Sequence, residues 1–242
     1  MTKRSVTERP RILDACCCGG GATRGYQLAG FHVTGIDINP QPNYCGDQFI
    51  QGDAIAYIRE HGHEYDAVVG SPPCQKYTLL NAYNHKTYPD LIAPMREAMR
   101  ATGRPYIIEN VEAAASELID PIMLCGPMFG LKIYRHRLFE ASFPILAPYE
   151  CDNRRDGHHK WLCTRNGYLP TLERPFMSIH GGKHSRAWQR KACEIMGTPW
   201  LAVPRNADVE RTKLGIREVC ESIPPAYTKR IGDDLRRYLE ST

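Results

Sequence analysis

Residues 11–38 read RILDACCCGGGATRGYQLAGFHVTGIDI, and this stretch decides the fold. An apolar run at 11–16 leads into a glycine-rich turn, residues 22–30 are typical of a helix, and residues 32–38 form a second apolar run. Glycines in a strand-to-helix turn let a ligand approach the backbone, and the helix that follows offers N–H groups to a carboxylate or phosphate. The stretch therefore predicts a strand, a helix and a second strand joined around a ligand-binding turn.

Further apolar runs alternate with helix-like segments along the next part of the chain. The strand-like runs are 48–53, 65–70 and 105–110, and the helix-like segments are 54–62 and 88–103, with a closing helix at 224–240. This alternation predicts an α/β fold with an open, mainly parallel sheet. In such a sheet the ligand site lies beyond the carboxyl ends of the strands.

The composition limits the classes of protein to consider. The 242 residues suit one domain, or one domain with a modest insertion. The polar N-terminus and the lack of an apolar run near the ~18 residues of a membrane span predict a soluble, cytosolic protein. Among the ten cysteines, Cys16, Cys17 and Cys18 are adjacent, and without a secretory signal we expect reduced thiols. The net charge of +4 is too small to establish a nucleic-acid partner.

Carboxylates stand at the ends of the second and third strand-like runs. Asp37 lies at the end of 32–38 and Asp53 at the end of 48–53, where a carboxylate can accept hydrogen bonds from ribose hydroxyls. The glycine spacing is not the dinucleotide fingerprint, so an adenosine ligand without a pyrophosphate is favoured, with S-adenosyl-L-methionine as the candidate. The alternative is a plain tight turn, with the two aspartates acting as helix caps.

A second informative stretch is VVGSPPCQKYT, residues 68–78, in which two prolines fix the backbone immediately before Cys74. A thiol here suggests covalent catalysis on cytosine. Carbon 5 of that ring is too electron-poor to attack a methyl group until a nucleophile has added to its neighbour. The alternative is a cysteine that is simply buried as a small apolar residue.

Several stretches together resemble the DNA cytosine carbon-5 methyltransferases. GSPPCQKYT (70–78) resembles the nucleophile loop of that family, IIENV (107–111) its Glu-Asn-Val motif and YRHRLFE (134–140) its arginine motif. LDACCCGGGATRGYQLAGF (13–31) resembles the cofactor loop, and ESIPPAYTKRIG (221–232) the final motif that packs against it. The resemblance implies a Rossmann-like S-adenosylmethionine-dependent methyltransferase fold. We expect a catalytic domain at 1–140 and 205–242, and a small, loop-rich target-recognition region at 141–204.

The resemblance implies catalytic roles for four residues. The Cys74 thiolate would add to carbon 6 of a flipped-out cytosine, and Glu109 would hold the amino group and protonate ring nitrogen 3. Arg137 would contact the carbonyl oxygen of the base, and Arg135 would orient Glu109. Both arginines alternate along an expected strand, which predicts that they share one face. The alternative for Glu109 and Asn110 is a strand-end turn with a helix cap.

The resemblance also implies which residues contact the cofactor. They are Cys16, Cys18, Gly20, Gly21, Asp37, Ile38, Asp53, Ala54, Pro73 and Ser222. Cys16 and Cys18 stand where the family usually has phenylalanine and glycine, and Glu221 stands where it usually has asparagine. Because a cysteine packs only weakly against adenine, we expect a lower cofactor affinity or an altered geometry.

The implied partner is double-stranded DNA, bound by a monomer in the cytoplasm of a bacterium or a phage-infected cell. By analogy, the enzyme would serve restriction-modification by protecting DNA from cleavage. Two alternatives stay open: methylation of cytosine in tRNA, and a non-catalytic DNA-binding protein that retains the fold.

The expected recognition region carries two further features. Cys151, His158, His159 and Cys163 could form a small zinc site, but their spacing is not a standard finger pattern, so surface histidines and free thiols are the favoured interpretation and no metal is expected. The segment HGGKHSRAWQRK (180–191) could be a phosphate-binding loop that leads into a short basic helix, or a solvated basic face.

Overall fold

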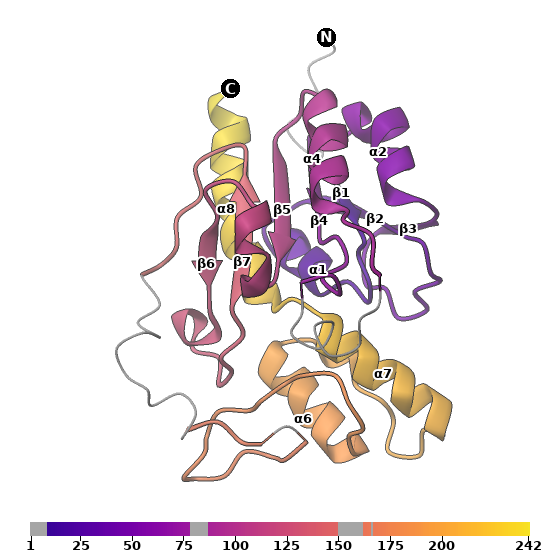
Figure 1. Cartoon of the computed structure of the whole chain (residues 1–242), viewed down its shortest axis with the longest axis vertical. Coiled ribbons are helices and arrows are strands. Elements are labelled where there is room, and N and C mark those ends of the chain that lie inside the picture. The colour runs from indigo at the N-terminus through magenta and orange to yellow at the C-terminus, as the bar shows by residue number, and fades with distance from the viewer. Residues whose placement is uncertain (1–8, 78–86, 150–161, 166) are drawn as a thin grey trace.

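The computed structural model describes residues 9–77, 87–149, 162–165 and 167–242. In these parts of the chain a seven-stranded sheet has the order β3-β2-β1-β4-β5-β7-β6 (Figure 1). The strands are β1 Arg11–Ala15, β2 His32–Asp37, β3 Gln48–Gln51, β4 Ala67–Gly70, β5 Tyr106–Asn110, β6 Ile122–Leu124 and β7 Arg137–Ala141. Strands β1 to β5 pair in parallel, whereas β7 is antiparallel to both β5 and β6. The predicted α/β class is confirmed.

Helices cover both faces of the sheet. Helices α1 (Gly21–Leu28) and α8 (Pro225–Ser241) pack on one face, and α2 (Ala54–His61) and α4 (Ile92–Ala101) pack on the other. Successive side chains of a strand point to opposite faces, so Ile12 of β1 joins the α1–α8 core and Leu13 joins the α2–α4 core. Short 3₁₀ helices occur at η1 Gly62–Glu64, η2 Glu112–Glu117, η3 Gly126–Phe129 and η4 Pro199–Leu201. The result is a three-layer sandwich.

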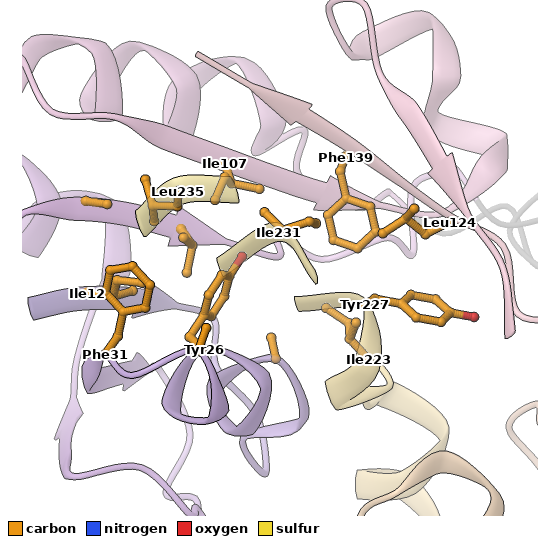
Figure 2. Packing of buried hydrophobic residues seen from close by; sticks show 14 of the residues in the cluster. Ile12, Tyr26, Phe31, Ile107, Leu124, Phe139, Ile223, Tyr227, Ile231 and Leu235 are labelled. Atoms are coloured by element: carbon orange, nitrogen blue, oxygen red, sulfur yellow. The ribbon is translucent and has the colours of Figure 1, made fainter. Parts of the chain in front are cut away.

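The closing helix α8 lies tightly against α1, the helix that follows the glycine turn. A Cβ atom on Gly25 would lie 1.9 Å from Thr228 Oγ1, and that hydroxyl donates a hydrogen bond of 2.8 Å to the carbonyl of Ala22. Figure 2 shows the core between these helices, in which Tyr26 of α1 and Ile231 of α8 are both buried. The expected packing of residues 221–232 against 13–31 is therefore observed.

Helices α6 (Arg186–Met196) and α7 (Val209–Glu221) form a separate layer at one end of the sheet (Figure 1). They share an apolar cluster that includes Trp188 of α6 and Ile216 of α7. The sequence analysis expected a loop-rich region at 141–204 and did not identify α7. Because α6 and α7 pack together, one apolar core crosses the expected boundary at residue 205.

Two simple expectations can be compared with the described ranges. In those ranges no helix combines the length and the hydropathy that a membrane crossing requires. Cysteines of the same ranges are free thiols and form no disulfide.

Candidate active site

A cavity of about 440 Å³ opens beyond the carboxyl ends of β1, β2, β4 and β5. The chain runs from β1 outward to β2 and β3, and then crosses to β4 on the other side of β1. The strand order therefore reverses between β1 and β4, and this reversal leaves a crevice where open α/β sheets bind ligands. The volume lies within the range of about 300–1,000 Å³ that is typical of small-molecule sites.

Most of the residues that the sequence analysis singled out line this cavity. They are Cys16, Cys18, Gly21, Asp37, Ile38, Asp53, Ala54, Pro73, Cys74, Glu109, Arg137 and Ser222. Gly20 and Arg135 are not among the lining residues. Gly20 instead caps α1 in the left-handed conformation, with φ 85°. The sequence analysis missed Asp14 and Arg217, which also line the cavity. Asp14 lies near the end of β1, just before the glycine turn, and this place in the sequence could have identified it as a candidate site residue.

The turn between β1 and α1 has an unusual backbone. Cys16 and Cys18 have φ values of 58° and 46°, a left-handed conformation that disfavours residues with a Cβ atom. Burial, followed by the nearby carboxylate of Asp37, raises the pKa of Cys16 to about 12, and burial also raises the pKa of Cys18. Both side chains are therefore neutral thiols that add apolar surface to the cavity wall.

Two aspartates, Asp37 at the end of β2 and Asp53 just after β3, have different surroundings. Asp37 accepts hydrogen bonds from the backbone N–H groups of Asn39 (2.9 Å) and Cys18 (3.1 Å), and its carboxylate keeps lone pairs for a further donor. Asp53 caps α2, because its Oδ1 accepts from Ile55 N at 2.9 Å and Ala56 N at 3.0 Å. The helix-cap alternative thus describes Asp53, which nevertheless borders the cavity.

The loop that carries Cys74 is tied to the sheet. It leaves β4 through Pro72 and Pro73, and the Nδ2 atom of Asn110, at the end of β5, donates a hydrogen bond of 2.9 Å to the Pro72 carbonyl. Cys74 is half-buried. Burial raises its pKa, the positive charge of Arg137 opposes that rise, and the negative charge of Glu109 adds to it. A neutral Glu109 would therefore favour the thiolate of Cys74.

Glu109 is 7% exposed and forms an ion pair in which Arg137 Nε lies 2.9 Å from its Oε1. Burial raises the pKa of Glu109, while Arg137 acts in the opposite direction. Arg135 donates hydrogen bonds to the carbonyls of Ile179 and Cys220 instead, and burial lowers its pKa to about 9. Arg137, rather than the expected Arg135, thus orients Glu109. The strand begins only at Arg137, so the assumed alternation does not include Arg135.

A second cavity, of about 720 Å³, lies between residues 181–186 and α7. Its lining includes five basic residues, Lys183, His184, Arg186, Lys213 and Arg217, and we call this cavity the basic groove. Arg217, Cys220 and Glu221 border both cavities, so the basic groove adjoins the first cavity. Cys151, His158 and His159 of the possible zinc set lie outside the described residues, and the residues that are described include no group of ligands able to hold a metal ion.

Solved structures resemble this chain over nearly its full length. An E. coli prophage protein described as a DNA modification methyltransferase has a TM-score of 0.64 and 14% identity, covering 96% of this chain and 99% of its own. The Entamoeba histolytica methyltransferase EhMeth has a TM-score of 0.61 and 14% identity, with 96% and 99% covered. The Dnmt2 methyltransferase of S. pombe has a TM-score of 0.58 and 15% identity, with 97% and 99% covered.

Comparison of sequences finds no relative of this chain, whereas comparison of structures does. No protein-family model matches the chain, and no curated protein matches it either. The structural likeness covers 96–97% of this chain. This chain therefore has the seven-stranded α/β fold of the S-adenosylmethionine-dependent methyltransferases, in the form seen in the prophage DNA modification and Dnmt2 structures.

Proposed function

We propose that this protein transfers a methyl group from S-adenosylmethionine to carbon 5 of a flipped-out cytosine in DNA, through a covalent adduct with Cys74. The observation that carries the proposal is the convergence of Cys74, Glu109 and Arg137 on one cavity with Asp37 and the glycine turn. A nucleophile, a buried carboxyl group with a raised pKa and a paired arginine are the groups that this chemistry needs.

The lining of the cavity suits the cofactor. Asp37 can accept a hydrogen bond from a ribose hydroxyl. Ile38 is 66% exposed and borders the cavity, which offers an apolar surface to a flat adenine ring. Ala54, Pro73 and Ser222 would complete the contacts. Bound S-adenosylmethionine would supply an electrophilic methyl group next to the Cys74 loop.

The side chains of the chain then have distinct tasks. Cys74, once deprotonated, adds to carbon 6 of the base, and Glu109 gives its proton to ring nitrogen 3, which relieves the negative charge that the addition creates. Arg137 holds Glu109 in place through its Nε contact of 2.9 Å. After carbon 5 has gained the methyl group, loss of its proton to a base expels Cys74, and nitrogen 3 returns its proton to Glu109.

The basic groove supports a nucleic-acid substrate. Lysine and arginine side chains give affinity through phosphates, and the groove shares Arg217 with the proposed catalytic cavity. A protein described as a DNA modification methyltransferase has the same fold over nearly the full chain. We therefore propose duplex DNA as the substrate. The proposal also includes a monomeric enzyme and a protective role for the modification in a bacterium or its phage.

The decisive test is a covalent trap. Duplex DNA that contains 5-fluorocytosine cannot lose a proton from carbon 5 after methyl transfer, so the enzyme stays bound through Cys74. We expect a denaturation-resistant complex with the native protein and S-adenosylmethionine, and none with Cys74→Ser. Tritiated methyl transfer to normal duplex DNA, with tRNA as competitor, identifies the substrate.

The outcomes separate the three candidate functions. Labelled 5-methylcytosine in DNA that tRNA does not suppress supports the proposal, whereas preferential labelling of tRNA replaces DNA by RNA as the substrate. DNA binding without any methyl transfer or trapped complex refutes the enzymatic function in favour of a binding protein.

A further inference from the structure

A small cavity adjoins the proposed catalytic cavity, and Asp14 and Glu109 are among the residues that line both. It has a volume of about 10 Å³, and Tyr26, Ser71 and Thr228 are among its other lining residues. That volume is close to the space one water molecule occupies. Asp14 is 1% exposed and Glu109 is 7% exposed, and both residues also border the larger cavity.

The two carboxyl groups have unequal partners. Thr23 Oγ1 donates a hydrogen bond of 2.5 Å to Asp14 Oδ2. The charged groups that act on Asp14 are themselves carboxylates, Asp37 and Glu109, and together with burial they raise its pKa to about 7. Among the described residues, therefore, no cation is a main influence on the charged form of Asp14.

Glu109 faces a more mixed environment. Arg137 and, more weakly, Arg135 favour its charged form, as does a hydrogen bond from Ser71, whereas burial opposes it. The other ionisable groups that interact with Asp14 are the hydroxyls of Tyr26 and Tyr44 and the thiols of Cys16, Cys17, Cys18 and Cys45. Burial and, to a smaller extent, Asp14 raise the pKa of each and keep it neutral.

We propose that Asp14 is a positioning residue for the proton of Glu109: the two buried carboxyl groups, which line one water-sized cavity, together hold one proton near neutral pH. Two like charges in such a site cannot both be ionised at low cost, so the pair titrates as a unit. When Asp14 is ionised, its negative charge favours the protonated form of Glu109, which stands against the flipped base.

The catalytic meaning of this pair rests on the proposed function. The proton on Glu109 is the one transferred to ring nitrogen 3, and it returns to Glu109 when Cys74 leaves, so the cycle gains and loses no proton at the pair. A neutral Glu109 also removes the negative charge that raises the pKa of Cys74. One shared proton thus promotes both nucleophilic attack and protonation of the base.

Carboxyl carbon-13 NMR of the ligand-free protein tests the pair without requiring activity. Glu109→Gln assigns the Glu109 signal. In the native protein we expect two coupled steps, with the upper step near pH 7. In Asp14→Asn, Glu109 should titrate in one step that lies at least about one pH unit lower, because partners this close interact by about that much. An unchanged upper step overturns the proposal.

A near-isosteric variant guards against a folding defect in Asp14→Asn. Thr23→Val removes the hydrogen bond that stabilises the Asp14 carboxylate, so it should move the upper step to higher pH. No movement would contradict the pairing.

The proposed function can fail separately from this pair. If DNA is methylated, kcat should fall at high pH where Glu109 loses its proton. In Asp14→Asn this fall should occur at lower pH, and a fall at the same pH as in the native protein would overturn the positioning role. If no methyl transfer occurs but the two-step titration is observed, the shared proton is supported and the methyltransferase function is refuted.

Discussion

Replacing Asn110 by alanine tests whether its tie to the nucleophile loop positions Cys74. The Asn110 side chain is 1% exposed, donates to the Pro72 carbonyl at 2.9 Å and accepts from the Val111 N–H at 2.9 Å. Alanine leaves the buried Pro72 carbonyl without its donor, which costs about 1–3 kcal/mol. For a protein of this size we expect the Tm to fall by about 2–12 °C.

The larger expected effect of Asn110→Ala is on chemistry. A displacement of about 1 Å at a reacting group costs on the order of 10²-fold in rate, so the covalent complex with 5-fluorocytosine DNA should form about that much more slowly. The assay is the rate of appearance of the denaturation-resistant complex at saturating DNA and S-adenosylmethionine.

Gln189→Ala is the matched control for this prediction. Gln189 is 0% exposed, and its amide donates to the Leu201 carbonyl at 2.7 Å and accepts from Val203 N at 3.0 Å. It lies in α6, so its loss should lower stability by a similar amount and leave the trapping rate unchanged. Equal slowing by both variants, or no slowing by Asn110→Ala, would refute the positioning argument.

Three further predictions concern Glu221, Asp14 and Gly25. Glu221→Asn should tighten S-adenosylmethionine binding, because it removes a negative charge that would face the carboxylate of the ligand. The gain should be about fivefold or less, since an exposed charge contact is worth at most about 1 kcal/mol. Calorimetry that shows no gain would mean that Glu221 does not face the ligand. Burial and two nearby carboxylates raise the pKa of Asp14 from its usual 3.8 to about 7, so the proton that Asp14 shares with Glu109 is bound below this window, and stability should fall as the pH rises through it. Urea unfolding should show a weaker fall for Asp14→Asn, and an identical slope would contradict the burial argument. Gly25→Ala should cost about 1–3 kcal/mol by overpacking, since its Cβ would lie 1.9 Å from Thr228 Oγ1; an unchanged Tm would show that α8 adjusts freely.

Local patterns in the sequence predicted the parallel half of the sheet well. The alternation of apolar runs with helical segments predicted β1 to β5 and the helices between them that the structure describes, because the period of a strand or helix is a property of neighbouring residues. The motif around Cys74 and that around Glu109 likewise predicted two residues that share one cavity. Their catalytic roles stay predictions.

Three features were decided only by the tertiary structure. They are the antiparallel pairing of β7, the α6–α7 cluster and the partners of the two arginines. Arg137 pairs with Glu109 of the neighbouring strand β5, and Arg135 reaches carbonyls near α6 and α7. No local period encodes such contacts, because they depend on which distant segments pack together. For the same reason the sequence predicted only that Asp14 lies within the first strand-like run, 11–16. The fold placed it with Glu109 in the lining of one cavity, where burial raises its pKa.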